Sequence, residues 1–398
     1  MVVSRLVVST GPDASSRRDD IDTLRAIACI ALVSYHVVGS HPGAGLHLPP
    51  EHWLSRFNQT FVDMRMPLFS FISGFVFVAS GFGRGAGARL AGKARRLLVP
   101  MLVVGTLFWA LRSLTIGPQG PLWHIAVLPY AHFWYLQATF VLMAVLIGAI
   151  YITQDTASVM RPTADREWRV GAALLGMTGF LWLWGARAEV NIFAVNNALY
   201  IGPFFFAGFI LARSRRGLKA LLGGGSVRRV LGGGILALAV LMGALLALEA
   251  VTLAGPARRA MTLVLGAAAC GGLMLLRPRS ALMARLGRAS YAVYLFHVFF
   301  TAGTRIVLLR IWPDMDVTLI WILALSAGLI GPVVVQWGAF AAPMGLSRFL
   351  GLALFGVRIP PRHRLLRRRR RLTGAAKAIP CSPSAISCRN SARITLSL

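Results

Sequence analysis

The residues of this sequence that could do chemistry lie inside long apolar segments. The first of these segments carries Arg25 and His36, eleven residues apart. At 100° per residue, eleven steps complete three turns and about 20°, so both side chains lie on one helix face, about 16 Å apart along the axis. A histidine at such a position can accept a proton near neutral pH. His36 is therefore a candidate proton acceptor on the same polar face as Arg25, although a membrane-surface arginine and a hydrogen-bonded histidine would also explain the pair.

Further polar residues within or next to apolar segments are candidate contacts for a substrate. Ser290, Tyr294 and His297 recur at i, i+4 and i+7, so they share one helix face. The full set of weaker candidates is Asp22, Asp63, Ser73, Trp134, Gln137, Ser290, Tyr294 and His297. Trp134 could equally be an aromatic residue at the membrane interface, and His297 a hydrogen-bonded core residue.

A cluster of cations precedes the third apolar segment. Lys93, Arg95 and Arg96 lie just before Pro100. Lys93 and Arg96 are three residues apart and share a helix face, so they could hold a phosphate group. Ordinary anchoring of a membrane helix by basic residues is the alternative explanation.

The composition determines the class of protein that must position these residues. The chain has 398 residues, of which 56% are hydrophobic and 14% are charged, and it contains four cysteines. Soluble domains carry about 25% charged residues, so the low charge excludes a soluble protein. The high apolar content excludes disorder for most of the chain. Four cysteines are too few for a disulfide-stapled secreted fold of this length. The net charge of +29 does not indicate nucleic-acid binding, because the basic residues lie mainly between apolar segments and in the tail.

The apolar segments predict the architecture. A bilayer core about 30 Å thick requires about 20 mostly apolar residues per helix. The segments that approach this length are residues 23–40, 59–80, 97–115, 132–152, 170–186, 195–212, 230–250, 260–276, 289–309 and 317–340. We therefore predict an all-α polytopic membrane protein with about ten transmembrane helices. Residues 67–75 and 203–209 have similar sequences but would run in the same direction, so they do not indicate an inverted repeat.

The distribution of charge orients these helices. With the N-terminus in the cytoplasm, 33 of the 42 Lys and Arg residues lie on the cytoplasmic side, as the positive-inside rule requires. Both termini are then cytoplasmic. We expect a disordered N-terminal lead over residues 1–20, a membrane domain over 21–345, and a basic, disordered cytoplasmic tail over 346–398.

Five motifs together give the sequence a family resemblance. They are Asp22-x-Leu24-Arg25-Ala26 followed by His36; Met66-Pro-Leu-Phe-x-Phe-Ile-Ser-Gly74-Phe; Lys93-x-x-Arg96; Phe133-Trp134-Tyr135-Leu136; and Ser290-Tyr291-x-x-Tyr294-Leu-x-His297. In this order and topology, from about residue 20 to 340, the sequence resembles acyltransferase family 3. These are bacterial inner-membrane enzymes that O-acylate envelope molecules. No esterase-like domain follows the membrane part, so the chain resembles the stand-alone form.

The resemblance implies a membrane-bound O-acyltransferase. It implies acyl-CoA, with acetyl-CoA expected first, as the donor substrate, and a hydroxyl of an envelope carbohydrate or glycolipid as the acceptor. It also implies catalysis by His36 with Arg25, and contact of Lys93, Arg95 and Arg96 with the CoA phosphates. The expected location is the bacterial cytoplasmic membrane, with the lipid bilayer as partner; no residues are assigned to a metal and no nucleic acid is expected.

A second function class is compatible with the same residues. A transporter or flippase for a polar lipid or sugar would also need buried polar side chains and interrupted helices. It would move its substrate without CoA. The sequence leaves open the acceptor, the acyl chain, the side of the membrane on which transfer occurs, the oligomeric state and the role of the tail.

Overall fold

The described part of the chain consists of helices and connecting turns, without a strand. The computed structural model describes residues 19–39, 45–80, 85–153, 164–214 and 225–359. The chain divides into two units, Met1–Val357 and Arg358–Leu398, and only the first two residues of the second unit are described. The predicted N-terminal lead up to residue 18 and the predicted tail from residue 360 lie outside the described residues.

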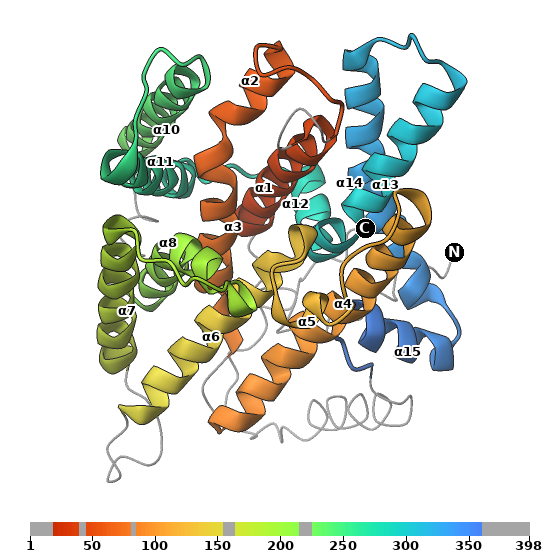
Figure 1. Cartoon of the computed structure of the whole chain (residues 1–398). Helices are drawn as coiled ribbons and strands as arrows, with labels where there is room; N and C mark the ends of the chain where they lie inside the picture. Colours follow the sequence, from red (N-terminus) through yellow and green to blue (C-terminus); the bar gives the residue numbers. More distant parts are fainter. Residues whose placement is uncertain (1–18, 40–44, 81–84, 154–163, 215–224, 360–398) are drawn as a thin grey trace, which may run out of the picture. The chain divides into compact units, whose positions relative to one another are not determined.

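The helices follow one another with short connections (Figure 1). They are α1 (Asp19–Val38), α2 (Trp53–Thr60), α3 (Val62–Phe77), α4 (Ala86–Thr115), α5 (His124–Val127), α6 (Trp134–Ile152), α7 (Ala164–Trp184), α8 (Val195–Arg213), α10 (Ser226–Ala247), α11 (Gly255–Leu276), α12 (Ala281–Arg288), α13 (Ser290–Ile311), α14 (Val317–Ala341) and α15 (Met344–Phe355). Short 3-10 turns occupy Val78–Ser80, Ala131–Phe133 and Ile192–Ala194.

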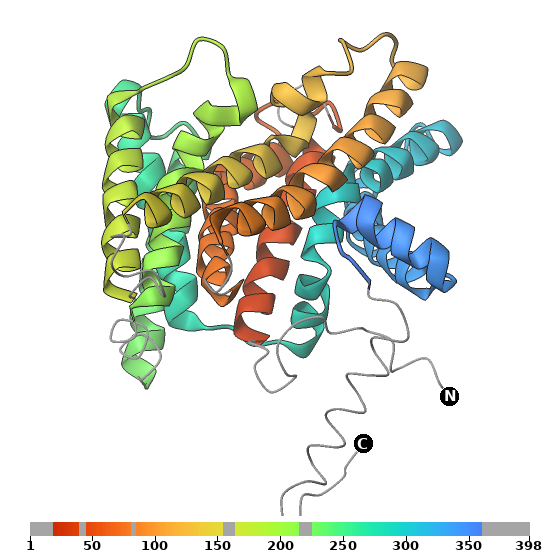
Figure 2. The ribbon, with the colours of Figure 1, turned by 90° about the horizontal axis from the view of Figure 1, so that it is seen from below.

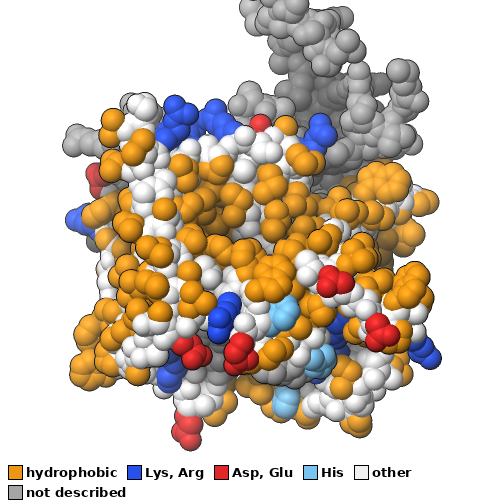
Figure 3. Space-filling model, turned by 90° about the horizontal axis from the view of Figure 1, so that it is seen from above, with side chains coloured by type: hydrophobic (Ala, Val, Ile, Leu, Met, Phe, Trp, Pro, Cys, Tyr) orange, Lys and Arg blue, Asp and Glu red, His pale blue; other side chains and the backbone are white. Residues whose placement is uncertain are grey.

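The predicted fold class is confirmed. A helix stands at the place of every predicted span, and among the described residues nine helical stretches are long and apolar enough to cross a membrane. The fifth predicted span, α7, falls short of this because Asp165, Arg166, Glu167 and Arg169 occupy its first two turns. Figure 3 shows the resulting surface on one face: a broad hydrophobic belt, Lys and Arg side chains along the upper edge, and Asp, Glu and His side chains near the lower edge.

The helical part extends further than the sequence suggested. We placed the end of the membrane domain at residue 345, but Met344–Phe355 forms helix α15, and the first unit continues to Val357. Helix α15 packs against α4 and α14. Gly356 ends it in a left-handed conformation (φ 62°) that favours glycine, with its backbone close to that of Arg95. Packing of this apolar segment against α4 therefore removes it from the tail.

The polar start of α1 is fixed by α12. Gly287 of α12 lies so close to the backbone of Asp22 that a Cβ there would overlap the Asp22 carbonyl oxygen. Asp20 accepts hydrogen bonds from Arg277, at 3.1 Å from Nε and 2.8 Å from Nη2. At the other end of α1, the Ser34 hydroxyl donates to the Asn58 side chain of α2 at 2.9 Å. Contacts at both ends hold the helix that carries Arg25 and His36, which runs through the middle of the bundle (Figure 2).

Helices α3 and α8 meet through the two similar sequence segments. A Cβ on Gly74 of α3 would overlap the carbonyl oxygen of Phe205, and a Cβ on Gly208 of α8 would overlap that of Phe71. The Ser70 hydroxyl donates to the Ile201 carbonyl at 2.8 Å. Small residues let membrane helices approach this closely, so the resemblance between residues 67–75 and 203–209 corresponds to a reciprocal helix contact.

We expect Gly208→Ala to destabilise the protein. The added methyl group forces α3 and α8 apart, and overpacking of this kind costs about 1–3 kcal/mol of unfolding free energy. The measurement is the midpoint of thermal unfolding in detergent. Gly176→Ala on α7 is the matched control, because nothing lies within 4 Å of a Cβ there. Equal stability of the two variants would contradict the close approach of α3 and α8.

Candidate active site

Three histidines meet inside the helix bundle, which we call the histidine cluster. His36 comes from α1, His132 from the 3-10 turn before α6, and His297 from α13. The ring centroids of His36 lie 6.0 Å from His132 and 4.9 Å from His297, and those of His132 and His297 are 5.0 Å apart. His297 is fully buried and His132 is buried. The structure therefore brings the predicted site residues His36 and His297 together with His132, which was not among the predicted site residues.

The hydrogen bonds of two of these rings define where their protons lie. Nδ1 of His297 is 2.9 Å from the carbonyl oxygens of Val293 and Tyr294. Because a carbonyl only accepts, Nδ1 carries the proton, and Nε2, which is buried and has no hydrogen-bond partner among the described residues, presents a lone pair. Nε2 of His132 faces the Leu295 carbonyl at 3.4 Å, so its lone pair is on Nδ1. The cluster can therefore take up a proton.

A guanidinium lies on the side of the cluster nearest α2 and α3. The Arg65 side chain of α3 is stacked over the Tyr35 ring, with Cζ 3.4 Å from the ring centroid. The Tyr35 ring is in edge contact with His36, at 5.3 Å between centroids. Arg65 also faces the Asn58 carbonyl, with Nη1 at 3.5 Å. Arg65 and Tyr35 thus form the layer next to His36.

A cleft with a volume of about 750 Å³ opens at the end of the bundle where α1 begins, and we call it the basic cleft. Five cations line it: Arg25, Arg89, Lys93, Arg96 and Arg288. No Asp or Glu is among its described lining residues. Such a cleft suits a ligand with several negative charges, because phosphate groups pair well with arginine and lysine.

Most of the basic residues singled out in the sequence line this cleft. Arg25 is part-exposed and its Nη1 pairs with Asp22 at 2.6 Å. Lys93 stands over the Phe77 ring, with Nζ 4.7 Å from its centroid. Arg96 is exposed and stands over the Tyr291 ring at 5.4 Å. Arg95 is not among the lining residues, because one step along a helix turns a side chain by 100°.

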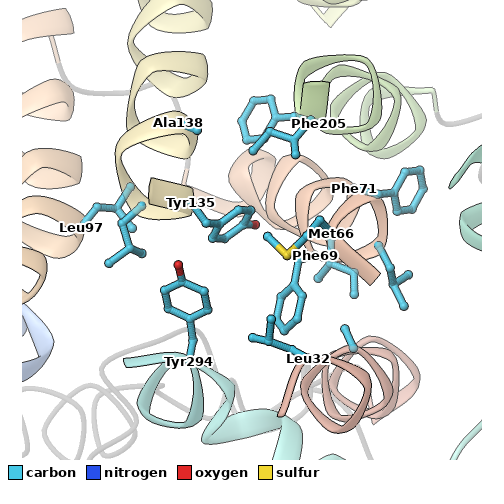
Figure 4. Close-up of a cluster of buried hydrophobic side chains, with 14 of the residues drawn as sticks. Leu32, Met66, Phe69, Phe71, Leu97, Tyr135, Ala138, Phe205 and Tyr294 are labelled. Atoms are coloured by element: carbon cyan, nitrogen blue, oxygen red, sulfur yellow. The ribbon is translucent and has the colours of Figure 1, made fainter. Parts of the chain in front are cut away.

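Two tyrosines separate the basic cleft from the histidine cluster. Tyr135 and Tyr294 line the cleft, and Figure 4 shows them reaching into the same space from α6 and α13, beside Phe69. Their rings are 5.5 Å apart, and the Tyr294 ring also lies 5.7 Å from His132. The Tyr294 hydroxyl donates to the His132 carbonyl. The Tyr135 hydroxyl is 2.9 Å from that of Ser73, which also lines the cleft. The side chains of Tyr135 and Tyr294 thus lie between the basic cleft and the histidine cluster.

The family comparison covers most of the described helices. Residues 18–337 match the model of acyltransferase family 3, which is described as an acyltransferase domain. The chain belongs to acyltransferase family 3. The matched range contains the histidine cluster and the whole basic cleft, and it ends before α15. Together with the helices long enough to span a bilayer, the match indicates a multi-pass membrane protein with an acyltransferase domain.

One curated relative is similar to part of the chain. The chain is 25% identical to the nodulation protein NolL of Mesorhizobium japonicum over 169 residues. These residues are 40% of this chain and 39% of the relative, so the match spans well under half of either protein. No solved structure matches the acyltransferase.

The weaker sequence candidates lie in five different settings. Ser73, Ser290 and Tyr294 line the basic cleft. Gln137 is buried and its Nε2 donates to the carbonyls of Ile125 and Ala126, at 3.2 Å each, which ties α6 to α5. The others are Asp22, paired with Arg25; Asp63, paired with Arg258; Trp134, in edge contact with Tyr135; and His297, in the histidine cluster.

Several site residues were not predicted. Tyr135 lies in the Phe133–Leu136 motif and His132 directly precedes it, but only Trp134 of that motif was singled out as a candidate substrate contact. Arg89, Arg288 and Tyr291 line the basic cleft as well. Within the described ranges, no group of three His, Cys, Asp or Glu side chains is placed to hold a metal ion.

Proposed function

We propose that this acyltransferase moves an acyl group, acetyl by preference, from acyl-CoA to a hydroxyl of an envelope carbohydrate or glycolipid. The observation that carries the proposal is the continuity between a cleft with five cations and no acidic residue among its described lining, the tyrosine pair, and the histidine cluster. The donor binds in the basic cleft, with its phosphates on Arg25, Lys93 and Arg96. The acyltransferase acts in the bacterial cytoplasmic membrane, and the cleft faces the cytoplasm, where acyl-CoA is made.

The chemistry assigned to the cluster is general base and general acid catalysis. His36 takes the proton of the acceptor hydroxyl, and the hydroxyl oxygen attacks the thioester carbonyl carbon. The carbon–sulfur bond then breaks, and the CoA thiolate takes the same proton from His36. The products are the ester and free CoA, and His36 returns to its neutral form. The buried position of the cluster keeps water away from the thioester.

The experiment that tests the proposal follows the acyl group. Membrane vesicles that contain the protein, with the basic cleft outward, receive acetyl-CoA labelled on the acetyl group, and label is measured in envelope glycans and glycolipids. Transfer by the wild-type protein, absent from vesicles without it, is the expected result. No transfer from acetyl-CoA or succinyl-CoA, with an acceptor-rich extract supplied, would contradict the proposal and favour a transporter that works without CoA.

We expect Arg96→Ala to weaken donor binding more than catalysis. Loss of one charged hydrogen bond to phosphate corresponds to about a tenfold to hundredfold rise in KM for acetyl-CoA, with kcat little changed. The Tyr291 hydroxyl donates to the Arg96 backbone carbonyl at 2.5 Å, so this contact survives the substitution. Arg285→Ala is the matched control, because Arg285 is exposed on α12 and does not line the cleft. An unchanged KM for acetyl-CoA in Arg96→Ala would contradict the assignment of the basic cleft as the donor site.

A further inference from the structure

A second cavity opens at the other end of α1, and we call it the polar pocket. Its volume is about 580 Å³. It is formed by the end of α1, by α2, by the start of α3, and by the ends of α10 and α11 that adjoin their connecting loop. The polar side chains that line it are Glu51, Ser55, Arg56, Asn58, Gln59, Asp63, Glu249, Thr252 and Arg258. None of the residues assigned to the donor lies here.

The charges of the polar pocket are unlike those of the basic cleft. Three carboxylates and two guanidinium groups line it, so the two signs nearly balance. One pair is internally satisfied: Asp63 Oδ2 lies 2.8 Å from Arg258 Nη2, and Asp63 Oδ1 accepts from the Thr262 hydroxyl at 3.1 Å. A polyanionic donor would gain little from such a lining. A neutral ligand with many hydroxyl groups can donate to the carboxylates and accept from the amide and guanidinium groups.

The polar pocket lies beside the histidine cluster. Val38 and Gly39, which line it, follow His36 by two and three residues, so His36 is only about 3 Å deeper along the axis of α1. From the pocket, Asn58 contacts Arg65, Arg65 is stacked on Tyr35, and Tyr35 contacts His36. Two stacked side chains, Arg65 and Tyr35, therefore separate the pocket from the proposed base.

These observations point to the acceptor site of the proposed reaction. We propose that the polar pocket binds a neutral, polyhydroxylated ring, and that movement of the Arg65 guanidinium off Tyr35 brings one of its hydroxyls to His36. The inference rests on the acyltransferase function proposed above and adds to it the place and the residues of acceptor recognition. The same chemistry is offered by a free saccharide and by a glycolipid headgroup.

Substitution of exposed lining residues provides the first measurement. Gln59 and Glu249 are exposed, so Gln59→Ala and Glu249→Gln leave the fold intact. Each loses a hydrogen bond to the acceptor, and the expected result is a rise of about fivefold to tenfold in KM for the acceptor, with kcat and the KM for acetyl-CoA unchanged. A rise in the KM for acetyl-CoA instead would overturn the assignment.

Chemical blocking of the polar pocket provides the decisive test. In a chain with Cys381→Ser and Cys388→Ser, Gln59→Cys places a thiol in the pocket, and Ala250→Cys places one on the exposed surface nearby; Cys29 and Cys270 are buried. Each variant is solubilised in detergent so that both ends of the bundle are accessible, treated with a bulky thiol reagent, and supplied with labelled acetyl-CoA and an acceptor-rich extract. Label is then counted separately in the lipid-soluble and water-soluble acceptor fractions, which distinguishes a glycolipid from a free saccharide.

We expect the reagent to stop transfer in Gln59→Cys and not in Ala250→Cys, while binding of labelled acetyl-CoA is unchanged in both. Equal transfer by the two treated variants would overturn the polar pocket as the acceptor site and leave the acyltransferase function standing. Absence of transfer in the untreated chain would instead contradict the proposed function, and the acceptor assignment would fall with it.

Discussion

Replacement of His36 by alanine is expected to reduce acyl transfer by about 10²–10⁴-fold, the usual contribution of a general acid or base. The reason is geometric, because His36 contacts both other histidines and, through Tyr35 and Arg65, the side of the polar pocket. The measurement is transfer of labelled acetyl groups by vesicles that contain equal amounts of folded protein. Binding of acetyl-CoA is expected to stay the same, since His36 does not line the basic cleft.

The matched control for this substitution is His124→Ala. His124 lies on α5, in edge contact with Trp123, and belongs to neither cavity. It therefore tests the loss of an imidazole without loss of the cluster. If His36→Ala, correctly inserted in the membrane, transferred acetyl groups as fast as His124→Ala, the catalytic role of His36 would be wrong.

A second large effect is expected at His297. Its Nδ1 is occupied by two backbone carbonyls of its own helix, and Nε2 is buried without a hydrogen-bond partner among the described residues. We expect His297→Leu, which removes this acceptor, to lower kcat by about tenfold to hundredfold, because His36, whose ring centroid is 4.9 Å away, then loses a neighbouring imidazole that can accept a proton. The measurement is kcat at saturating acetyl-CoA.

The comparison of two substitutions at this position separates positioning from packing. His297→Gln keeps a side-chain oxygen that can accept a hydrogen bond, whereas His297→Leu does not. We expect the glutamine variant to retain more of kcat than the leucine variant. If both variants lost thermal stability and kept kcat, His297 would be only a buried structural residue.

The helical membrane architecture could be predicted because its signals are local. Apolar runs of about 20 residues and the scarcity of charge indicate the fold class without any tertiary information. The same holds for residues on one helix face: Ser290, Tyr294 and His297 do share a face, which runs from the basic cleft to the histidine cluster. Helix periodicity predicted that Arg25 and His36 lie at different depths on one face of α1. In the structure Arg25 lines the basic cleft and His36 belongs to the histidine cluster.

The rest of the site depends on contacts between distant segments. His132 precedes α6 in a 3-10 turn, next to Ala131 with a φ of 45°, and meets α13 through the Leu295 carbonyl. No periodicity within one segment indicates such a meeting. The polar pocket is likewise built from five helices and two loops, so only Asp63 among its residues was noticed in the sequence as a candidate substrate contact. The helical part extends past the predicted boundary at residue 345 because α15 packs against α4 and α14, and these contacts cannot be read from the sequence of α15.

The contact between α3 and α8 bears on which parts of the acyltransferase stay still during a turnover. The backbones at Gly74 and Gly208 touch with no side chain between them, so sliding by part of a turn would drive carbonyl groups into the opposite helix. Helix α3 also carries Arg65, which is stacked on Tyr35, and Phe69, which is in edge contact with Tyr294. In the proposed reaction, α3 and α8 would therefore form a fixed wall, and any opening that admits a substrate would come from the helices around them.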